Sequence, residues 1–256
     1  AVEIGGREVD VRVSILPTNF GERVVMRILD RGGTALTLES LGFLEEDEQK
    51  VIESIDAPQG MVLVTGPTGS GKSTTLYAAL GRVNREGINI LTAEDPVEYS
   101  IDGVGQVQIK EDIGLTFTTA LRSFLRQDPE VILVGEIRDK ETADIAIKSA
   151  LTGHLVLSTL HTNDAVSTIT RLLNMGVPSY LIASSLSLIV AQRLARRICD
   201  QCKAVDDQVS EAHLLAVGFS LEEASRLQLY KGTGCAQCAN TGYKGRQGIY
   251  EVLKIT

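Results

Sequence analysis

Residues 66–73 read GPTGSGKS, and their types and spacing could hold the phosphates of a nucleotide. Glycines in such a loop let backbone N–H groups curl around phosphate oxygens. Lys72 can reach the outer phosphates, and the Ser73 hydroxyl can ligate Mg²⁺. The sequence therefore predicts ATP and Mg²⁺ as cofactors. The expected nucleotide contacts come from Gly66, Pro67, Thr68, Gly69, Ser70, Gly71, Lys72, Ser73 and Thr74.

The residues on either side of this loop favour a phosphate site over a glycine-rich turn with a surface lysine. Residues 61–65 (MVLVT) form a short apolar run typical of a buried strand, and residues 74–80 (TTLYAAL) have helical spacing. A helix that starts at the loop points free N–H groups and its positive dipole end at the anion. Strand, loop and helix together predict a nucleotide-binding unit.

Acidic residues near the ends of two further apolar runs could act on the bound phosphates. Residues 131–134 (VILV) lead to Glu136, which stands where an NTPase needs an acid beside Mg²⁺, usually an Asp. Residues 88–92 lead to an acidic cluster that includes Glu94 and Glu98, and one of these carboxylates could orient the attacking water. The alternative is that these acids lie on solvated loops without a catalytic role. For the cluster with Glu94 and Glu98, taken without the other motifs, this alternative is the commoner case.

Two of the three histidines flank a strand-like run at residues 155–158. His154 and His161 could sense or stabilise a γ-phosphate from a strand end, but a half-buried imidazole with satisfied hydrogen bonds is an equally good interpretation. His213 lies in a polar stretch between the cysteines, and we assign it no role.

The four cysteines form two C-x-x-C pairs that could bind one zinc ion. Cys199 and Cys202 make the first pair, and Cys235 and Cys238 the second. Four thiolates suit a closed, tetrahedral structural site, although the pairs are further apart than in compact zinc ribbons. Disulfides are the competing interpretation. Zinc is favoured because an ATP-dependent enzyme without a secretory signal is expected in a reducing compartment.

The composition narrows the classes of partner. The 256 residues carry a formal charge of −8, which disfavours indiscriminate binding to nucleic acid. No apolar run is long enough to span a bilayer, and no signal-peptide pattern is present. A local basic patch near the first cysteine pair is either a solvated helix end or a docking surface for an acidic loop. It comprises Arg193, Arg196, Arg197 and Lys203.

The order of patterns predicts an α/β chain with several parts. Residues 1–31 read as short strands, the remainder of a small β-rich, PAS-like subdomain, and 32–58 as a linker followed by a helix at 45–55. Strands alternate with helices over 59–196, which predicts a largely parallel sheet covered by helices. Residues 197–245 hold the tetracysteine module, and 246–256 are expected to return to the core. The first residue is not methionine, so we expect a fragment of a longer protein.

Four ordered segments together resemble the secretion ATPase superfamily, in particular the type II secretion and type IV pilus assembly ATPases. They are GPTGSGKST, EDPVEY, ILVGEIRD and TGHLVLSTLHTND, and the resemblance extends from Arg12 through Glu251. It implies a RecA-like P-loop core in a homohexameric cytoplasmic motor. The motor would bind ATP between subunits and act on an inner-membrane platform protein, associating peripherally with that membrane.

The resemblance also implies roles for individual residues. Glu98, with Glu94, would polarise water; Glu136 would act in a variant Walker B motif; and His154 and His161 would form a His box whose second member approaches the γ-phosphate. Arginines that serve the site are the remaining candidates: Arg12 and Arg27 reaching across the subunit interface, then Arg138, Arg122 and Arg126.

The tetracysteine module is common in assembly ATPases of this superfamily and generally missing from retraction ATPases. The expected function is therefore ATP hydrolysis that powers pilin polymerisation, with the N-terminal docking region lying outside this sequence. Type II secretion through pseudopilus assembly is the first alternative. A nucleotide-sensing scaffold and a nucleic-acid translocase on the same core are the others, and no nucleic-acid partner is expected.

Overall fold

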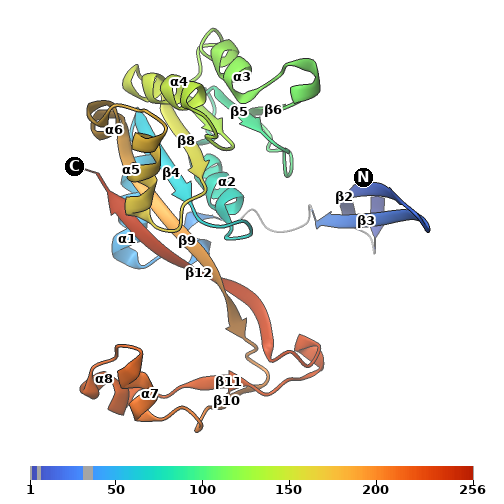
Figure 1. Cartoon of the computed structure of the whole chain (residues 1–256), viewed down its shortest axis with the longest axis vertical. Helices are drawn as coiled ribbons and strands as arrows, with labels where there is room; N and C mark the ends of the chain where they lie inside the picture. The colour runs from blue at the N-terminus through green and yellow to red at the C-terminus, as the bar shows by residue number, and fades with distance from the viewer. Residues whose placement is uncertain (1, 5–6, 31–36, 256) are drawn as a thin grey trace. The chain divides into compact units, whose positions relative to one another are not determined.

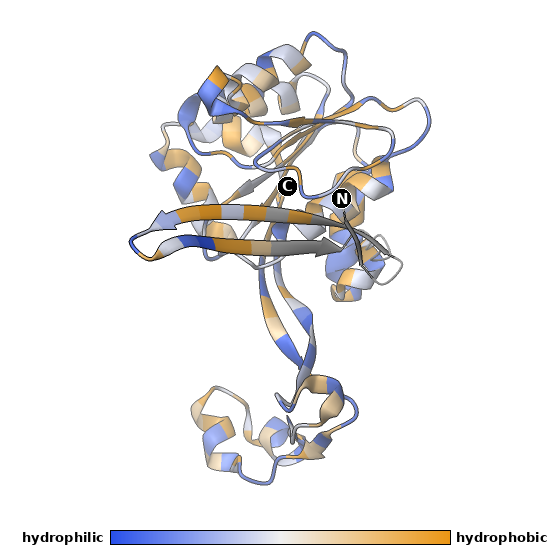
Figure 2. Ribbon diagram, turned by 90° about the vertical axis from the view of Figure 1, so that its right-hand side faces the viewer, coloured by the Kyte–Doolittle hydropathy of each residue, from blue (hydrophilic) through white to orange (hydrophobic). Residues whose placement is uncertain are grey.

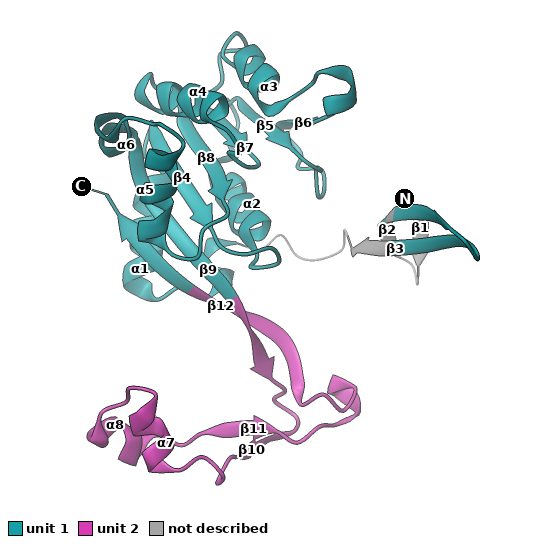
Figure 3. Ribbon diagram, viewed as in Figure 1, with its two compact units in different colours: residues 1–193, 250–256 teal, residues 194–249 magenta. Residues whose placement is uncertain are grey.

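The computed structural model describes residues 2–4, 7–30 and 37–255. Residues 31–36, where the predicted linker begins, lie outside them. The chain divides into two compact units, residues 1–193 with 250–256, and residues 194–249 (Figure 3). Each unit is described by itself.

The N-terminal residues form a three-stranded antiparallel sheet in the order β1-β2-β3. Its strands are β1 (Val2–Ile4), β2 (Arg7–Thr18) and β3 (Gly21–Asp30). The turn between β2 and β3 ends at Gly21, whose φ of +112° favours glycine. Bands of apolar residues mark β2 and β3 (Figure 2), and Val13, Ile15 and Met26 are exposed. Arg12 and Arg27 are Cα partners in this ladder.

A seven-stranded sheet forms the centre of the first unit (Figure 1), in the order β12-β9-β4-β8-β7-β5-β6. From β9 to β6 every neighbouring pair is parallel. This confirms the predicted α/β class. The strands are β4 (Gly60–Thr65), β5 (Ile90–Glu94), β6 (Val104–Gln108), β7 (Val131–Val134), β8 (Leu155–Leu160), β9 (Leu186–Ile198) and β12 (Tyr243–Lys254).

Alternate residues of β4 enter two different hydrophobic clusters. Val62 and Val64 pack in one cluster with Leu76 and Leu80 of α2. Met61 and Leu63 pack in the other with residues of α4, α5 and α6. Because side chains alternate along a strand, helices must cover both faces of this sheet. The helices are α1 (Glu45–Ile55), α2 (Lys72–Val83), α3 (Phe117–Phe124), α4 (Lys140–Leu151), α5 (Ala165–Asn174) and α6 (Ser179–Ser185), with short 3₁₀ turns at Leu38–Leu41 and Glu111–Ile113.

Helix α1 and strand β7 begin and end where the sequence pattern placed them, and β4, α2 and β8 are longer than their predicted runs. The strand predicted at 88–92 is shifted along the chain, because β5 spans Ile90–Glu94. Asn89 precedes the strand; its backbone N–H donates to the Glu130 carboxylate, and its side-chain amide donates to the carbonyls of Gln127 and Asp128. The shift makes Glu94 the last residue of a buried strand.

The second unit is an insertion in the sequence of the first. Two long strands, β9 and β12, each contribute residues to both units. It contains an antiparallel pair, β10 (Lys203–Val205) with β11 (Tyr230–Gly232), and the helices α7 (Glu211–Ala216) and α8 (Leu221–Arg226). Ser220 and Glu223 form a capping box at the start of α8. A 3₁₀ turn at Ala236–Cys238 holds the second cysteine pair. Among the described residues, no helix is long and apolar enough to cross a membrane.

Candidate active site

The phosphate loop joins β4 to α2, as predicted. Three of its glycines have left-handed φ values, +144° at Gly66, +80° at Gly69 and +91° at Gly71. A Cβ on Gly66 would lie 2.4 Å from the carbonyl oxygen of Gln192, so another residue cannot stand there without a shift of the backbone. No side chain caps the N-terminus of α2, which leaves its first N–H groups free for an anion. The loop therefore fits a phosphate.

Lys72 lies over this loop. Its Nζ donates to the carbonyl oxygens of Gly66 at 2.9 Å and Pro67 at 3.2 Å. Burial lowers the pKa of Lys72, and the negative charge of Glu136 acts in the opposite direction. Ser73 is exposed at the start of α2, where its hydroxyl is accessible to a metal ion.

Gln192 supports the loop from β9, and sequence reasoning missed it. Its side chain is 3% exposed; Nε2 donates to the Ser70 carbonyl at 2.8 Å, and Oε1 accepts from the Thr75 hydroxyl at 2.8 Å. One amide thus connects β9, the loop and α2. The available signal was a glutamine that directly follows the apolar run at residues 188–191.

Glu136 lies where the sequence placed it, two residues after β7. The hydroxyls of Ser158 and Thr159 donate to the carbonyls of Val134 and Gly135, both at 2.7 Å, and so tie this segment to β8. The Glu136 carboxylate accepts from Arg138 and lies 3.3 Å from His161 Nε2. With Lys72 it forms the charged centre of the site.

Arg138 is surrounded by carboxylates. Besides Glu136, it lies 3.4 Å from Asp95 and 3.6 Å from Glu111, and these partners raise its pKa. The structure therefore places the Arg138 guanidinium against Glu136. Arg122 pairs instead with Glu141 at 2.6 Å. Arg126 lies beyond the end of α3, and its guanidinium donates to the backbone carbonyl of Arg122.

The two histidines lie at opposite ends of β8. Because β4 and β8 are parallel with Thr65 opposite Leu160, His161 follows its strand beside the phosphate loop. The Thr162 hydroxyl lies 2.6 Å from that of Thr65, which holds this segment against β4. His154 precedes β8, about 20 Å away along the strand. Its Nδ1 contacts the carbonyl of Ser149 at 3.0 Å. The structure does not bring His154 to the expected site.

Glu94 and Glu98 occupy different environments. Glu94 is 4% exposed, and its carboxylate accepts hydrogen bonds from Tyr77, Thr92 and Gln106. The Tyr77 hydroxyl also accepts from the backbone N–H of Glu98 at 3.2 Å. Burial and the bond to Glu94 raise the pKa of Tyr77 far above its usual value. Glu94 therefore anchors the turn, whereas Glu98 is half-buried and has no such cage.

The four cysteine sulfurs cluster within 4.8 Å of one another. The sulfurs of Cys199 and Cys235 are 3.8 Å apart, as are those of Cys202 and Cys238. A tetrahedral zinc with bonds of about 2.3 Å needs sulfurs roughly 3.8 Å apart, whereas a disulfide needs about 2.05 Å. The donor set therefore fits zinc, and all four cysteines are free.

Backbone groups complete the surroundings of the sulfurs. Although burial acts in the opposite direction, the N–H groups of Cys235 and Gly242 lower the pKa of Cys238 to about 6. Burial raises the pKa of Cys202 to about 11. Hydrogen bonds from backbone N–H groups are the usual support for thiolates that bind a metal.

The comparisons with known proteins agree with this geometry. The family described as Type II/IV secretion system protein matches residues 1–256. The chain belongs to this family. The type IV pilus assembly ATPase PilB of Myxococcus xanthus is 56% identical over 249 residues, 97% of this chain and 44% of that protein. The type II secretion system ATPase E of Vibrio cholerae is 52% identical over 255 residues, which are 100% of this chain and 50% of that protein. The chain spans about half the length of these curated relatives.

Solved structures show the family's fold. The pilus retraction motor PilT with bound ADP aligns with a TM-score of 0.66 and 36% identity, over 74% of this chain and 57% of that chain. The ATPase DotB of Yersinia pseudotuberculosis aligns over 100% of this chain and 59% of its own with a TM-score of 0.67, at 24% identity. The predicted RecA-like core is therefore confirmed.

Proposed function

We propose that this chain is the motor part of a Mg²⁺-dependent ATP hydrolase. The observation that carries the proposal is the convergence of the phosphate loop, Glu136 and His161 at one edge of a parallel sheet. Relatives that are 56% and 52% identical are named as ATPases, and the similar PilT structure contains ADP. Parallel α/β sheets bind their ligands at this edge.

The residues divide the work of transferring a phosphoryl group to water. Loop N–H groups and Lys72 would hold the phosphates, with Lys72 exchanging its present carbonyl partners for phosphate oxygens. Mg²⁺, when bound by Ser73 and Glu136, would neutralise charge on those oxygens. Glu98 would orient the attacking water, and His161 would contact the γ-phosphate from beside Glu136.

The site is completed by another copy of the chain in this proposal. Arg12 and Arg27 are Cα partners in the β2–β3 ladder, so both arginines that would serve the neighbour's ATP belong to one sheet. An arginine supplied in trans stabilises charge on the transferring phosphoryl group. We therefore propose a homohexamer in which ATP lies between subunits.

The cellular role follows from the relatives. We propose a cytoplasmic motor, peripheral to the inner membrane, that acts on a platform protein and powers type IV pilus assembly, as the name of the 56% identical relative suggests. Type II secretion is the second candidate, because a 52% identical relative carries that name. The acidic composition supports neither a nucleic-acid partner nor a translocase. Deleting the gene and scoring surface pili and secreted proteins separately distinguishes the two candidates.

The second unit is proposed to be a structural zinc module. Its support is that all four sulfurs lie within 4.8 Å of one another, and that three of the six sulfur pairs are 3.7–3.8 Å apart, as at the edges of a tetrahedral site. Zinc there would connect the end of β9 to the segment before β12.

Replacing the phosphate-loop lysine tests the enzymatic proposal. Lys72→Ala should lower the rate of ATP hydrolysis by about 100-fold or more, because the transferring phosphoryl group loses the lysine cation that would contact its oxygens. Lys148→Ala is the matched control, since Lys148 is exposed in the last turn of α4. Phosphate release measures both. Normal turnover by Lys72→Ala would rule the site out, and ATP binding by the unaltered chain without turnover would favour a nucleotide-sensing scaffold.

A further inference from the structure

In the second unit, basic and acidic residues occupy different parts of the sequence. Residues 194–204 and 234–249, which surround the cysteines, contain five basic residues and one acidic residue, Asp200. Residues 205–233, which include α7 and α8, contain five acidic and two basic residues. The five basic residues are Arg196, Arg197, Lys203, Lys244 and Arg246. A positive region of this kind is unexpected on a chain whose formal charge is −8.

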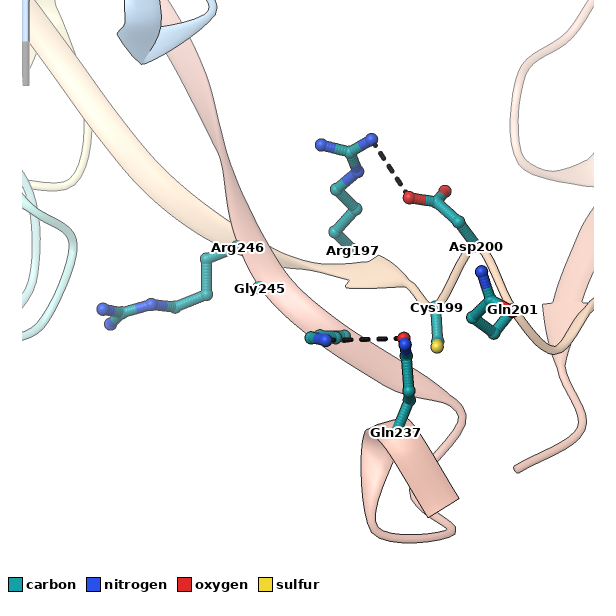
Figure 4. Close-up of a pocket in the computed structure, with 8 residues that line it drawn as sticks. Arg197, Cys199, Asp200, Gln201, Gln237, Gly245 and Arg246 are labelled. Carbon is teal, nitrogen blue, oxygen red and sulfur yellow. Dashed lines mark hydrogen bonds and ion pairs between the residues drawn. The ribbon is translucent and has the colours of Figure 1, made fainter. Parts of the chain in front are cut away.

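Three of these cations line one hollow beside Cys199 (Figure 4). Arg197 lies 3.5 Å from Asp200, and Lys244 donates to the side-chain oxygen of Gln237 at 3.4 Å. Within the described part of the chain, no hydrogen bond or ion pair is found for the Arg246 guanidinium. The hollow therefore presents positive charge that its own residues only partly neutralise.

These cations do not serve to neutralise negative charge on the cysteine thiolates. A zinc ion with four thiolates would carry a net charge of −2, which could attract arginine and lysine. In Figure 4, however, the side chains of Arg197 and Arg246 point away from Cys199. The Cys238 sulfur instead receives backbone N–H groups at 3.2 and 3.3 Å. Arg196 and Lys203 are also engaged elsewhere, each 4.0 Å from the ring of a tyrosine.

The occupant of such a hollow must be an anion. The acidic half of a second copy is a weaker candidate, because three of its five carboxylates already have partners. Asp206 pairs with Lys231 at 2.9 Å, Glu222 pairs with Arg226 at 2.9 Å, and Glu223 caps α8. An anionic membrane is disfavoured too, since a flat bilayer would face a concave site and would also repel the acidic residues of the same unit.

We propose that this hollow docks a short acidic segment of a partner protein. One carboxylate would replace Asp200 as the partner of Arg197, and another would reach Lys244 or Arg246. The side-chain amides of Gln201 and Gln237, which also line the hollow, can hydrogen-bond the peptide backbone. The proposal does not depend on ATP hydrolysis by this chain.

Binding of an acidic peptide tests the proposal. The probe is a fluorescein-labelled hexapeptide of alternating glutamate and glycine, with a glutamine version as the neutral control, titrated with the zinc-loaded 256-residue chain and read by anisotropy. Lys244→Gln with Arg246→Gln should weaken binding about tenfold, because each exposed ion pair contributes up to about 1 kcal/mol. Arg226→Gln with Lys148→Gln removes the same charge elsewhere and should leave binding nearly unchanged.

Three other outcomes of this binding experiment would overturn the proposal. It fails if the acidic and neutral peptides bind alike, or if both double variants weaken binding equally, since net charge alone would then be responsible. Vesicles containing 30% phosphatidylglycerol form a second arm, and binding to vesicles without binding to the peptide would assign the hollow to a membrane. Circular dichroism and zinc content of each variant establish that the unit remains folded.

Discussion

At the scale of single residues, the two acids of the predicted cluster have separate tasks. Glu94 is enclosed by hydroxyl and amide donors, and a buried carboxylate of this kind is a structural anchor. Among the described residues, the hydrogen bond found for Glu98 joins its backbone N–H to the Tyr77 hydroxyl. Tyr77 therefore joins the helix that follows the phosphate loop to the turn that carries the proposed water-orienting acid.

Removing that hydroxyl tests the positioning role of Tyr77. Tyr77→Phe should lower kcat about tenfold with little change in KM, because Glu98 would lose its backbone tether while the phosphate contacts stay intact. The free energy of unfolding should fall by about 1–3 kcal/mol, since buried Glu94 loses a donor. Steady-state kinetics and urea denaturation measure the two effects. Tyr180→Phe, at an exposed site on α6, is the control. An unchanged kcat would show that the tether does not matter for turnover.

At the scale of elements, the site depends on three strands that end at one edge. β4 leads into the phosphate loop, β7 leads to Glu136, and β8 leads to His161. Hydroxyls hold these ends together, as Ser158 and Thr159 bond to β7 and Thr65 bonds to Thr162. β9 adds Gln192 from the other side of β4. A rigid arrangement of this kind places charged groups before a substrate arrives.

Changing Gln192 tests whether β9 shapes the loop. Gln192→Glu keeps the acceptor for Thr75 but replaces the donor to Ser70 with a carboxylate oxygen that repels the carbonyl. We expect the dissociation constant of an ATP analogue to rise about tenfold, with a lower melting temperature. Gln208→Glu, at an exposed position, introduces the same charge as a control. Calorimetric titration gives both affinities, and equal values would exclude a supporting role for Gln192.

At the scale of the whole molecule, the two units are expected to depend differently on a bound metal. The second unit is small, with few buried apolar residues besides the cysteines, so a bound metal should supply much of its stability. The nucleotide site has its own core in the first unit. Losing zinc should therefore unfold one unit and leave the other able to bind nucleotide.

Cys202→Ser with Cys238→Ser should abolish the expected one zinc per chain. Limited proteolysis should then cut within residues 199–242, while binding of an ATP analogue in the first unit persists. Elemental analysis and mass spectrometry of the fragments provide the measurements. Ser210→Ala and Ser225→Ala, in the same unit but away from the sulfurs, serve as the control. A native chain that neither carries nor takes up zinc would remove the structural metal site.

The shared site predicts that turnover depends on assembly. Activity of the chain should rise faster than linearly with protein concentration, because each ATP needs residues from two copies. Mixing inactive Lys72→Ala with inactive Arg27→Ala should restore part of the activity, since some interfaces would combine an intact Lys72 with an intact Arg27. Strictly linear activity, or a mixture as inactive as its components, would contradict the shared site.

The sequence by itself determined the residues that are neighbours along the chain. The phosphate loop, the strand before Glu136 and the two C-x-x-C pairs are local patterns whose chemistry depends on short spacing, and each lies where it was predicted. Helix α1 spans Glu45–Ile55 as expected, because its charged, amphipathic pattern is stopped at Pro58.

Only the tertiary structure decided which of these residues meet. Parallel strands bring their carboxyl ends together, so His161 joins the site while His154, only seven residues earlier, lies at the opposite edge. The roles of Gln192 and Tyr77 depend on partners 117 and 17 residues away. Likewise, the hollow at Arg197 forms because residues near 200 and 245 return to the same cysteine cluster. Such contacts across strands depend on how the chain folds back on itself, and no local spacing encodes them.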